Sequence, residues 1–468
     1  MDGHTPKTSD AERLLLLQRA AHRREGPPSA RVRIDRLDRL DDMVRKRSES
    51  FADAISADFS NRSRFETALL ETMVTLSAIR YARKNVRWWM EPAYQEVDMT
   101  FWPGSAWIRR EPLGVIGIVS PWNYPLQLAL SPLVDVIAGG NRAMIKPSEQ
   151  TPNFSDLLHR AISETFAEEE VGVVTGGAEV ASAFTRLSFD HLVFTGSTSI
   201  GRKVAQAAAE GLVPTTLELG GKSPAVICPS GSMTKAVKAI AYGKFINAGQ
   251  TCIAPDYVMA PRERMIELAE QILTEARRAY PDVGGDYSSM ISERAFDRMT
   301  TAIAEAEQGG AKVLRHPTPS DRSRRMLPPV VVLDAPENCT LMREEIFGPV
   351  LPIIGYDTLD DALEWINSHP HPLALYIFAE DRKEQTKVLD RTQSGGVTVN
   401  GTLLHIAQEG LPFGGVGASG MGAYHGRAGF DRFTHARAVF RTGFFNAASW
   451  LAPPYGKRAK RLLRFLMR

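Results

Sequence analysis

The stretch GVIGIVSPWNYPLQLALSPLVDVIAGGNRAMIKPSE, residues 114–149, decides the fold class of this chain. It begins with an apolar strand-like run, continues through a long helical segment and returns to a second strand-like run at AMIKPSE, 143–149. Working outward, VGVVTGG (171–177) and HLVFTGS (191–197) repeat the alternation, each preceding a helical segment. This order predicts an α/β fold with a parallel sheet covered by helices on both faces.

The pattern extends in both directions from this stretch. Toward the N-terminus, apolar residues at helical spacing predict helices over 29–59 and 63–89. Toward the C-terminus, strand-like runs at 224–230, 328–334 and 349–356 continue the α/β alternation. The 468 residues are too many for one ordinary core, so we expect two or three domains.

Charge and cysteine content exclude several classes of protein. A net charge of +2 gives no reason to expect nucleic acid as a partner. The first residues lack the basic segment of a secretory signal, and three cysteines cannot form a disulfide framework. We therefore expect a cytoplasmic protein.

The C-terminal segment KRAKRLLRFLMR (457–468) contains six basic residues and no acidic one. At helical spacing its lysine and arginine side chains share one face and its leucines the opposite face. Such a basic amphipathic helix predicts peripheral contact with an anionic membrane surface. The same pattern is equally typical of a helix that packs on its own subunit or on a dimer partner.

Two predicted strand ends carry residues that suit a dinucleotide. Gly196 and Gly201 lie at a strand-to-helix turn, where backbone N–H groups can meet a phosphate, although the spacing alone equally suits an ordinary tight turn. Lys146 and Glu149 follow another strand, and they can bind ribose hydroxyls or be a solvated surface pair. Because a carboxylate repels a 2′-phosphate, we expect NAD, with NADP as the alternative.

Cys252 is the candidate nucleophile. It lies in FINAGQTCIAPDY (245–257), where the small and polar residues before it predict an exposed turn rather than a core. Cys228 and Cys339 lack such a context and are expected to be structural.

Glu218 and Asn123 could serve the same chemistry. Glu218 stands between two leucines, where an apolar environment raises a carboxyl pKa and makes a useful base, unless an ion pair satisfies it. Asn123 lies between two prolines in PWNYP (121–125) and could direct its amide at an oxyanion or satisfy its own turn.

Six motifs together resemble the aldehyde dehydrogenase superfamily. They occur in that family's order, at compatible separations, over about 300 residues. The motifs are PWNYP (121–125), GSTSIG (196–201), ELGGKSP (218–224), GQTC (249–252), EEIFGPV (344–350) and LPFGGVGASGMG (411–422). The resemblance implies a Rossmann-like cofactor domain (1–95 and 110–220), an α/β catalytic domain (221–423), a bridging oligomerisation ribbon (96–109 and 424–445) and a basic tail (446–468).

The resemblance also implies a role for each matching residue. Cys252 is the nucleophile, Glu218 the base for deacylation, and Asn123 with the Cys252 backbone N–H the oxyanion hole. The cofactor contacts are Lys146 and Glu149 on the adenosine ribose, Gly196, Ser197 and Gly201 at the phosphates, Glu345 on the nicotinamide ribose and Phe347 beside the ring. Tyr124 and Phe413 are aromatic walls of the substrate tunnel.

The segment YHGRAGFDRFTH (424–435) resembles the class 3 branch, which includes fatty-aldehyde and coniferyl-aldehyde dehydrogenases. This likeness implies a homodimer that uses NAD or NADP. The stretch 396–415 favours the coniferyl-aldehyde subgroup, with medium- or long-chain aliphatic aldehydes as the alternative. Asn400-Gly401 and the segment 402–410 depart from the branch, which leaves specificity open.

Three other activities remain to be weighed. A CoA-acylating dehydrogenase would not need Glu218 to activate water, and a non-catalytic dinucleotide-binding relative would need neither Cys252 nor Glu218. A cysteine hydrolase would need a histidine partner, and no histidine lies in a recognisable hydrolase context. We expect no metal, because His369 and His371 lie in a proline-flanked loop without other ligands.

Overall fold

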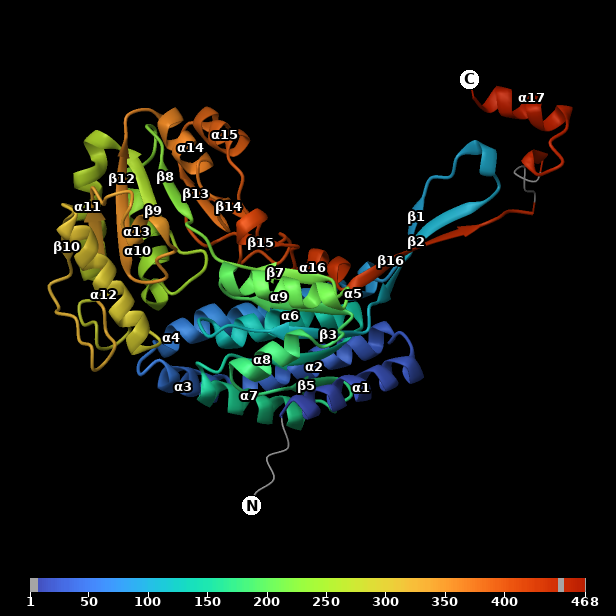
Figure 1. Cartoon of the computed structure of the whole chain (residues 1–468), viewed down its shortest axis with the longest axis horizontal. Helices are drawn as coiled ribbons and strands as arrows, with labels where there is room; N and C mark the ends of the chain where they lie inside the picture. Colours follow the sequence, from blue (N-terminus) through green and yellow to red (C-terminus); the bar gives the residue numbers. More distant parts are fainter. Residues whose placement is uncertain (1–6, 445–449, 468) are drawn as a thin grey trace, which may run out of the picture.

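The computed structural model describes residues 7–444 and 450–467. Residues 1–6 of the predicted cofactor domain, residue 445 of the bridging segment and residues 446–449 and 468 of the tail lie outside the described residues. Figure 1 shows two sheet-containing lobes side by side, with a ribbon that extends away from them and ends near the C-terminal helix.

The first lobe contains a sheet of six strands within the described residues, in the order β15-β7-β6-β3-β4-β5. The strands are β3 (Val115–Val119), β4 (Arg142–Lys146), β5 (Val171–Val173), β6 (His191–Thr195), β7 (Thr215–Glu218) and β15 (Gly420–Met421). Those from β3 to β7 are parallel, and β15 adds antiparallel to β7, with Gly420 opposite Glu218. The connecting helices are α6 (Pro125–Gly139), α7 (Pro152–Thr165), α8 (Ala178–Thr185) and α9 (Thr198–Glu210). The predicted parallel α/β arrangement is confirmed.

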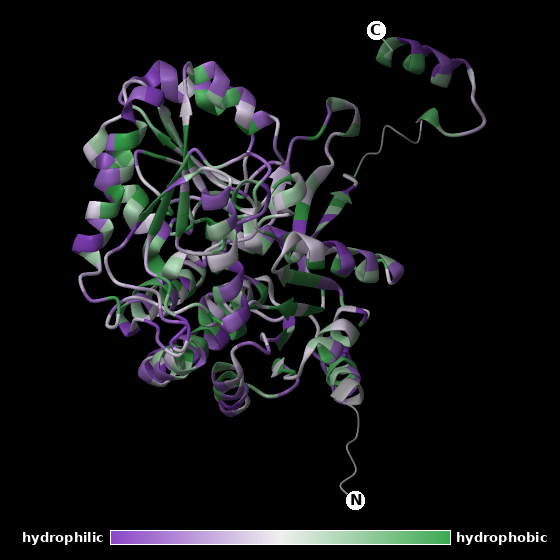
Figure 2. Cartoon of the chain, turned by 60° about the vertical axis from the view of Figure 1, so that its left-hand side comes forward, coloured by the Kyte–Doolittle hydropathy of each residue, from purple (hydrophilic) through white to green (hydrophobic). Residues whose placement is uncertain are grey.

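The second lobe contains a sheet of seven strands in the described chain, ordered β10-β11-β12-β9-β8-β13-β14. The strands are β8 (Pro224–Ile227), β9 (Tyr257–Pro261), β10 (Lys312–Arg315), β11 (Val330–Leu333), β12 (Val350–Tyr356), β13 (Ala374–Phe378) and β14 (Gly396–Val399). Only β10 runs antiparallel to its neighbour. The helices are α10 (Met233–Phe245), α11 (Met265–Ala279), α12 (Glu293–Gln308), α13 (Thr340–Arg343), α14 (Leu359–Asn367) and α15 (Arg382–Arg391). Figure 2 shows apolar strands inside this lobe and polar residues on its outer helices.

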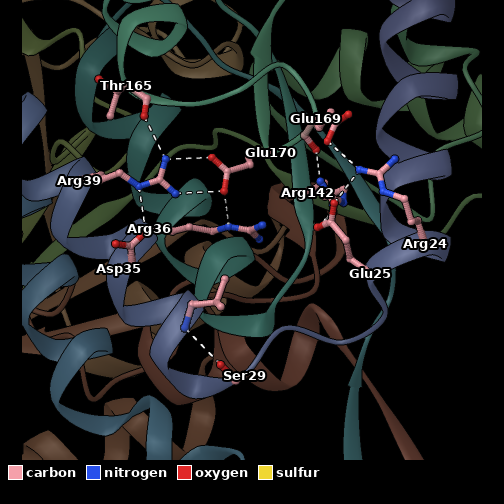
Figure 3. Close-up of polar contacts among 11 residues, drawn as sticks. Arg24, Glu25, Ser29, Asp35, Arg36, Arg39, Arg142, Thr165, Glu169 and Glu170 are labelled. Carbon is pink, nitrogen blue, oxygen red and sulfur yellow. Dashed lines mark hydrogen bonds and ion pairs between the residues drawn. The ribbon is translucent and has the colours of Figure 1, made fainter.

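An N-terminal helical layer packs on the first lobe. It comprises α1 (Lys7–Glu25), α2 (Ala30–Lys46), α3 (Ser48–Asp58), α4 (Arg64–Thr67), the π-helical turn η1 (Ala68–Thr72) and α5 (Met73–Trp89). Ion pairs fasten it to the sheet (Figure 3): Glu170, before β5, accepts from Arg36 at 2.9 Å and from Arg39 at 2.9 and 3.0 Å. These half-buried ion pairs hold the N-terminal helical layer against the six-stranded sheet.

The ribbon consists of β1 (Ala93–Gln95), β2 (Ser105–Pro112) and β16 (Thr434–Arg441), all antiparallel. The short helix α16 (Gly426–Arg432) returns against the first lobe before β16 begins. The predicted C-terminal helix is present as α17 (Lys457–Leu466). No helix of residues 7–444 or 450–467 is long and apolar enough to span a bilayer.

Candidate active site

Predicted site residues gather at the carboxyl edge of the six-stranded sheet. Lys146 ends β4 and Glu218 ends β7, while Gly196 directly follows β6. Asn123 lies in the loop between β3 and α6. Because the chain leaves β3 in one direction for β4 and β5 and later returns for β6 and β7, this edge contains a topological switch point, where open α/β sheets bind ligands.

Cys252 follows a turn with unusual backbone angles. After α10 ends, Asn247 and Ala248 adopt φ of 50° and 51°, and Gly249 adopts 72°. The prediction of an exposed turn is wrong: Ala248 is 1% exposed and Gln250 is fully buried. Cys252 itself is half-buried.

Hydrogen bonds from sequence-distant residues explain why a polar turn can be buried. Gln250 Nε2 donates to the carbonyls of Asn247 and Ser289, each at 3.0 Å. Gln250 Oε1 accepts from the Ile291 N–H at 2.9 Å. All hydrogen-bonding groups of this amide side chain are therefore engaged at an interior position, which removes most of the cost of burying it.

Asn123 lies against the same turn. Its Nδ2 donates to the Gln250 carbonyl at 3.1 Å. Its own carbonyl accepts from Arg62 Nη1 at 2.8 Å and from Asn247 Nδ2 at 3.0 Å. The next residue, Tyr124, pairs its hydroxyl with Thr251 Oγ1 at 2.7 Å. The structure thus brings the predicted oxyanion amide and the predicted nucleophile into one network.

The surroundings of Cys252 favour the protonated thiol. Burial raises its pKa to about 12, and the carboxylates of Glu345 and Glu218 act in the same direction. The backbone N–H groups of Cys252 and Ile253 oppose the shift, because they stabilise the thiolate. A base must therefore remove this proton before the sulfur can act as a nucleophile.

Glu218 has the properties of such a base. It is 2% exposed, and neither of its carboxylate oxygens has a hydrogen-bond partner among the described residues. Burial raises its pKa well above the usual range, and only the charge of Arg432 opposes the shift. The Arg432 guanidinium donates instead to the Thr215 carbonyl and Thr216 Oγ1, at 2.7 and 2.9 Å.

The predicted phosphate turn offers free donors. Ser197 precedes α9 without capping it, and its Oγ pairs with Ser199 Oγ at 3.2 Å. The Ile200 N–H donates to the Ser197 carbonyl at 3.1 Å, which leaves the N–H groups of Thr198 and Ser199, at the start of the helix, for an anionic ligand. At the end of β4, which β3 separates from β6, buried Lys146 donates to Glu149 at 3.3 Å, and burial lowers the lysine pKa. These donors and this acceptor fit the phosphates and ribose hydroxyls of a dinucleotide.

Glu345 reaches across from the second lobe. Its carboxylate lies so close to Gly220 that a Cβ at that position would be 2.0 Å from Oε2. Burial raises the Glu345 pKa to about 8, a shift that Asp256 reinforces and the Gly221 N–H opposes. Phe347, two residues later, has φ of 49° and packs edge-on against Trp122 at 5.4 Å between ring centroids.

Phe413 packs in a cluster of aromatic and histidine side chains. It is 4% exposed and stacks with His425 at 5.4 Å and with His405 at 6.3 Å. Gly201, which was predicted at the phosphates, allows close packing of α9 on the end of β7, because a Cβ there would meet the Leu219 side chain at 2.5 Å.

Sequence reasoning missed the groups that the N-terminal layer contributes. Arg62, Glu66 and Glu71 are all buried and contact the loops that carry Asn123 and Asn247. One signal was available: Glu71 falls four residues before Thr75 and eight before Ile79, on the apolar face of a predicted helix. The buried tyrosine Tyr424, whose hydroxyl has no partner among the described residues, was also missed.

The aldehyde dehydrogenase family model matches residues 7–439. A probable coniferyl aldehyde dehydrogenase of Pseudomonas aeruginosa is 46% identical over 454 residues, which cover 97% of this chain and 95% of that protein. Aldehyde dehydrogenase family 3 member A2 of Mus musculus is 37% identical over 435 residues, covering 92% and 88%. The solved substrate-bound structure of Staphylococcus aureus AldH superposes with a TM-score of 0.92 at 34% identity, covering 97% of this chain and 99% of that one. The predicted class 3-like membership and fold are confirmed.

Proposed function

This chain belongs to the aldehyde dehydrogenase family and oxidises aldehydes with NAD(P), and from that premise we propose that its substrates are aromatic aldehydes such as coniferaldehyde. The observation that carries the proposal is the 46% identity, over 97% of the chain, to a relative named as a probable coniferyl aldehyde dehydrogenase. Aromatic rings near the reaction centre, including Tyr124, Trp122 and Phe413, suit a planar substrate.

In the proposed mechanism Cys252 supplies the nucleophile. Glu218 takes the thiol proton, and the sulfur bonds to the carbonyl carbon to give a thiohemiacetal. Asn123 Nδ2 carries two hydrogens, one of which donates to Gln250, so the second can bind the oxyanion together with the Cys252 N–H.

When bound, NAD(P) would supply the hydride acceptor that lets the Cys252 thiohemiacetal become a thioester. The free N–H groups at the start of α9, Lys146 with Glu149, and Glu345 with Phe347 would hold the cofactor. After Glu218 releases its proton to solvent, it takes a proton from water, and the hydroxide adds to the thioester carbon. The C–S bond then breaks, the acid leaves and Cys252 regains its proton.

A substrate panel tests this proposal. Wild type would be assayed with coniferaldehyde, octanal and decanal, with NAD or NADP and without CoA, by reduced-nicotinamide absorbance. We expect the highest kcat/KM for coniferaldehyde, and no reaction from Cys252→Ala. A clear preference for octanal or decanal would contradict the proposed substrate class. A strict requirement for CoA would show that CoA, rather than water, takes the acyl group.

We also propose the predicted domain division, in which 1–95 and 110–220 bind cofactor, 221–423 carry catalysis and 96–109 with 424–445 bridge two copies in a cytoplasmic homodimer. Support comes from exposed apolar side chains on the ribbon, with Tyr94, Met99 and Trp102 at 73, 81 and 62% exposure. Sedimentation analysis should show a dimer that Trp102→Glu dissociates. Leu389→Glu, an exposed leucine on α15, is the control, and a monomeric wild type would contradict the proposal.

The same proposal extends to peripheral membrane contact through 457–468. Helix α17 has five basic residues and no acidic one, and the side chains of Phe465 within it and of Met467 directly after it are exposed. The chain should sediment with phosphatidylglycerol vesicles and not with phosphatidylcholine, and Arg461→Glu with Arg464→Glu should abolish this. Equal recovery with both vesicles, or none with either, would refute membrane contact.

A further inference from the structure

We infer that Glu66 is a positioning residue, which holds the catalytic turn (246–252) in place from the N-terminal helical layer. The inference rests on the proposed role of Cys252 as the nucleophile on this turn. Glu66 does not touch the reacting atoms, and its effect passes through Asn247.

The contact joins residues that are 181 positions apart. Glu66 lies in α4 and is 8% exposed. Its Oε2 accepts from the Asn247 N–H at 2.9 Å and from Ser288 Oγ at 3.3 Å. A buried carboxylate that accepts from a backbone N–H forms a strong, charge-assisted hydrogen bond.

Asn247 is the residue at which the turn departs from ordinary geometry. Asn247 and Ala248 both occupy the left-handed region, which disfavours residues with a Cβ, although asparagine tolerates it better than alanine. Such conformations persist only where surrounding contacts over-determine them. The bond from Glu66 fixes the first peptide N–H of this disfavoured pair.

Asn247 transmits its position to both halves of the reaction centre. Its Nδ2 donates to the Asn123 carbonyl at 3.0 Å and to the Gln250 carbonyl at 3.1 Å. The same Gln250 carbonyl accepts from Asn123 Nδ2. A shift of Asn247 would therefore move the proposed oxyanion amide and the peptide two residues before Cys252 together.

The charge state of Glu66 can change near neutral pH. Burial raises its pKa to about 7, against the opposing effect of Arg62 and its two hydrogen-bond donors. The other ionisable groups that face it are Asp286, Tyr124, Tyr242, Tyr280 and Tyr287. The tyrosine hydroxyls stay neutral around pH 7 because burial raises their pKa values, so they do not titrate together with the carboxyl of Glu66. The ionised form, dominant at higher pH, is the better acceptor.

The test compares Glu66→Ala and Glu66→Gln in the full chain. We measure kcat/KM and the rate at which iodoacetamide alkylates Cys252, identified by peptide mass. Glu66→Ala should lower kcat/KM by about 10–100-fold, as expected for a small misplacement of reacting groups, and should change the alkylation rate. Glu66→Gln keeps an acceptor oxygen, so it should recover most activity yet lose the inflection near pH 7 in the pH profile.

Asp58→Ala is the matched control. Asp58 is similarly buried and accepts the Asn153 and Phe154 N–H groups at 3.1 and 3.0 Å, away from the catalytic turn. It should lower Tm without changing kcat/KM or alkylation. The inference is overturned if Glu66→Ala leaves both readouts unchanged, if Asp58→Ala changes them equally, or if Glu66→Gln keeps the wild-type pH profile. A Cys252→Ala chain that still oxidises aldehydes would instead refute the proposed function.

Discussion

Strand β7 and the π-helical turn η1 each bury one glutamate, and the surroundings of the two carboxylates are opposite. Glu71, in η1, is fully buried, and its Oε2 accepts from the Leu126 and Gln127 N–H groups at 2.7 and 3.2 Å. Its Oε1 pairs with Arg62 at 3.1 Å. Glu218, at the end of β7, is equally inaccessible and has no hydrogen-bond partner among the described residues.

The difference distinguishes a carboxylate that stabilises the fold, Glu71, from one proposed to take part in the reaction, Glu218. Glu71 and its partners cap the start of α6 and hold Arg62 against the Asn123 loop, so Arg62 and two backbone N–H groups offset part of the cost of burying this carboxylate, although burial still raises its pKa. No hydrogen bond offsets the cost of burying the charge of Glu218, so its pKa is raised, as is useful for a general base. A buried acid without partners is therefore the better marker of reactivity, and the matched substitutions to glutamine test that statement.

The largest expected effect is on turnover in Glu218→Gln. Loss of a general base typically slows a reaction by about 10²–10⁴-fold. Steady-state kcat should fall by that order, while Tm near neutral pH should not fall, since no hydrogen bond is lost. Stopped-flow absorbance measures turnover and calorimetry measures Tm. Unchanged kcat would remove the distinction between the two carboxylates.

The next effect is on stability in Glu71→Gln. Removing one partner of a buried ion pair leaves the other charge uncompensated and typically costs about 3–5 kcal/mol. We expect the free energy of unfolding to fall by this order in urea denaturation, with a smaller loss of kcat through Arg62 and Asn123. If Glu71→Gln instead abolished turnover without loss of stability, Glu71 would belong to the chemistry and the comparison would fail.

The sequence predicted one of these carboxylates and missed the other for a physical reason. Glu218 stands between leucines in a strand, so its burial follows from local pattern alone. Glu71 accepts from backbone N–H groups in the first turn of α6, at Leu126 and Gln127, and nothing near Glu71 in the sequence indicates that contact. The alternation of strands and helices was predicted well, as at 191–197, where β6 spans His191–Thr195 and α9 follows, because hydrophobic periodicity reports local structure. The order of the strands within the two sheets was not predicted.

The burial of the catalytic turn (246–252) also could not be predicted from local sequence. Its polar residues predicted exposure, yet the carbonyl of Ser289 and the N–H of Ile291 satisfy Gln250 in the interior. These partners are visible only once the second lobe is folded. Cys252, Asn123 and Glu218 could be proposed from motifs, whereas the groups that position them come from tertiary contacts.

Glu345 is a third buried carboxylate, intermediate between Glu71, which has several partners, and Glu218, which has none among the described residues. It accepts from the Gly221 N–H, and a Cβ on Gly220 would overlap its carboxylate. Gly220→Ala should therefore displace Glu345, raise KM for NAD more than it lowers kcat, and cost about 1–3 kcal/mol of stability. Gly285→Ala, where a Cβ meets nothing closer than 3.9 Å, is the control and should change neither quantity. An unchanged KM would show that Glu345 can move without consequence for the cofactor.

The smallest effect is on the pH dependence of stability. The folded-state pKa of Glu218 is raised above the usual 4.5, so its contribution to stability is full below that value and is lost as pH rises toward the folded pKa. Glu218→Gln removes this loss, and its Tm should exceed that of wild type by about 1–3 °C at about pH 9, with the difference closing toward pH 5. Glu71→Gln should stay below wild type across the range, because the ion pair with Arg62 is broken at every pH. Parallel curves for wild type and Glu218→Gln would mean that a partner compensates Glu218 in the folded chain, and the two glutamates would no longer differ.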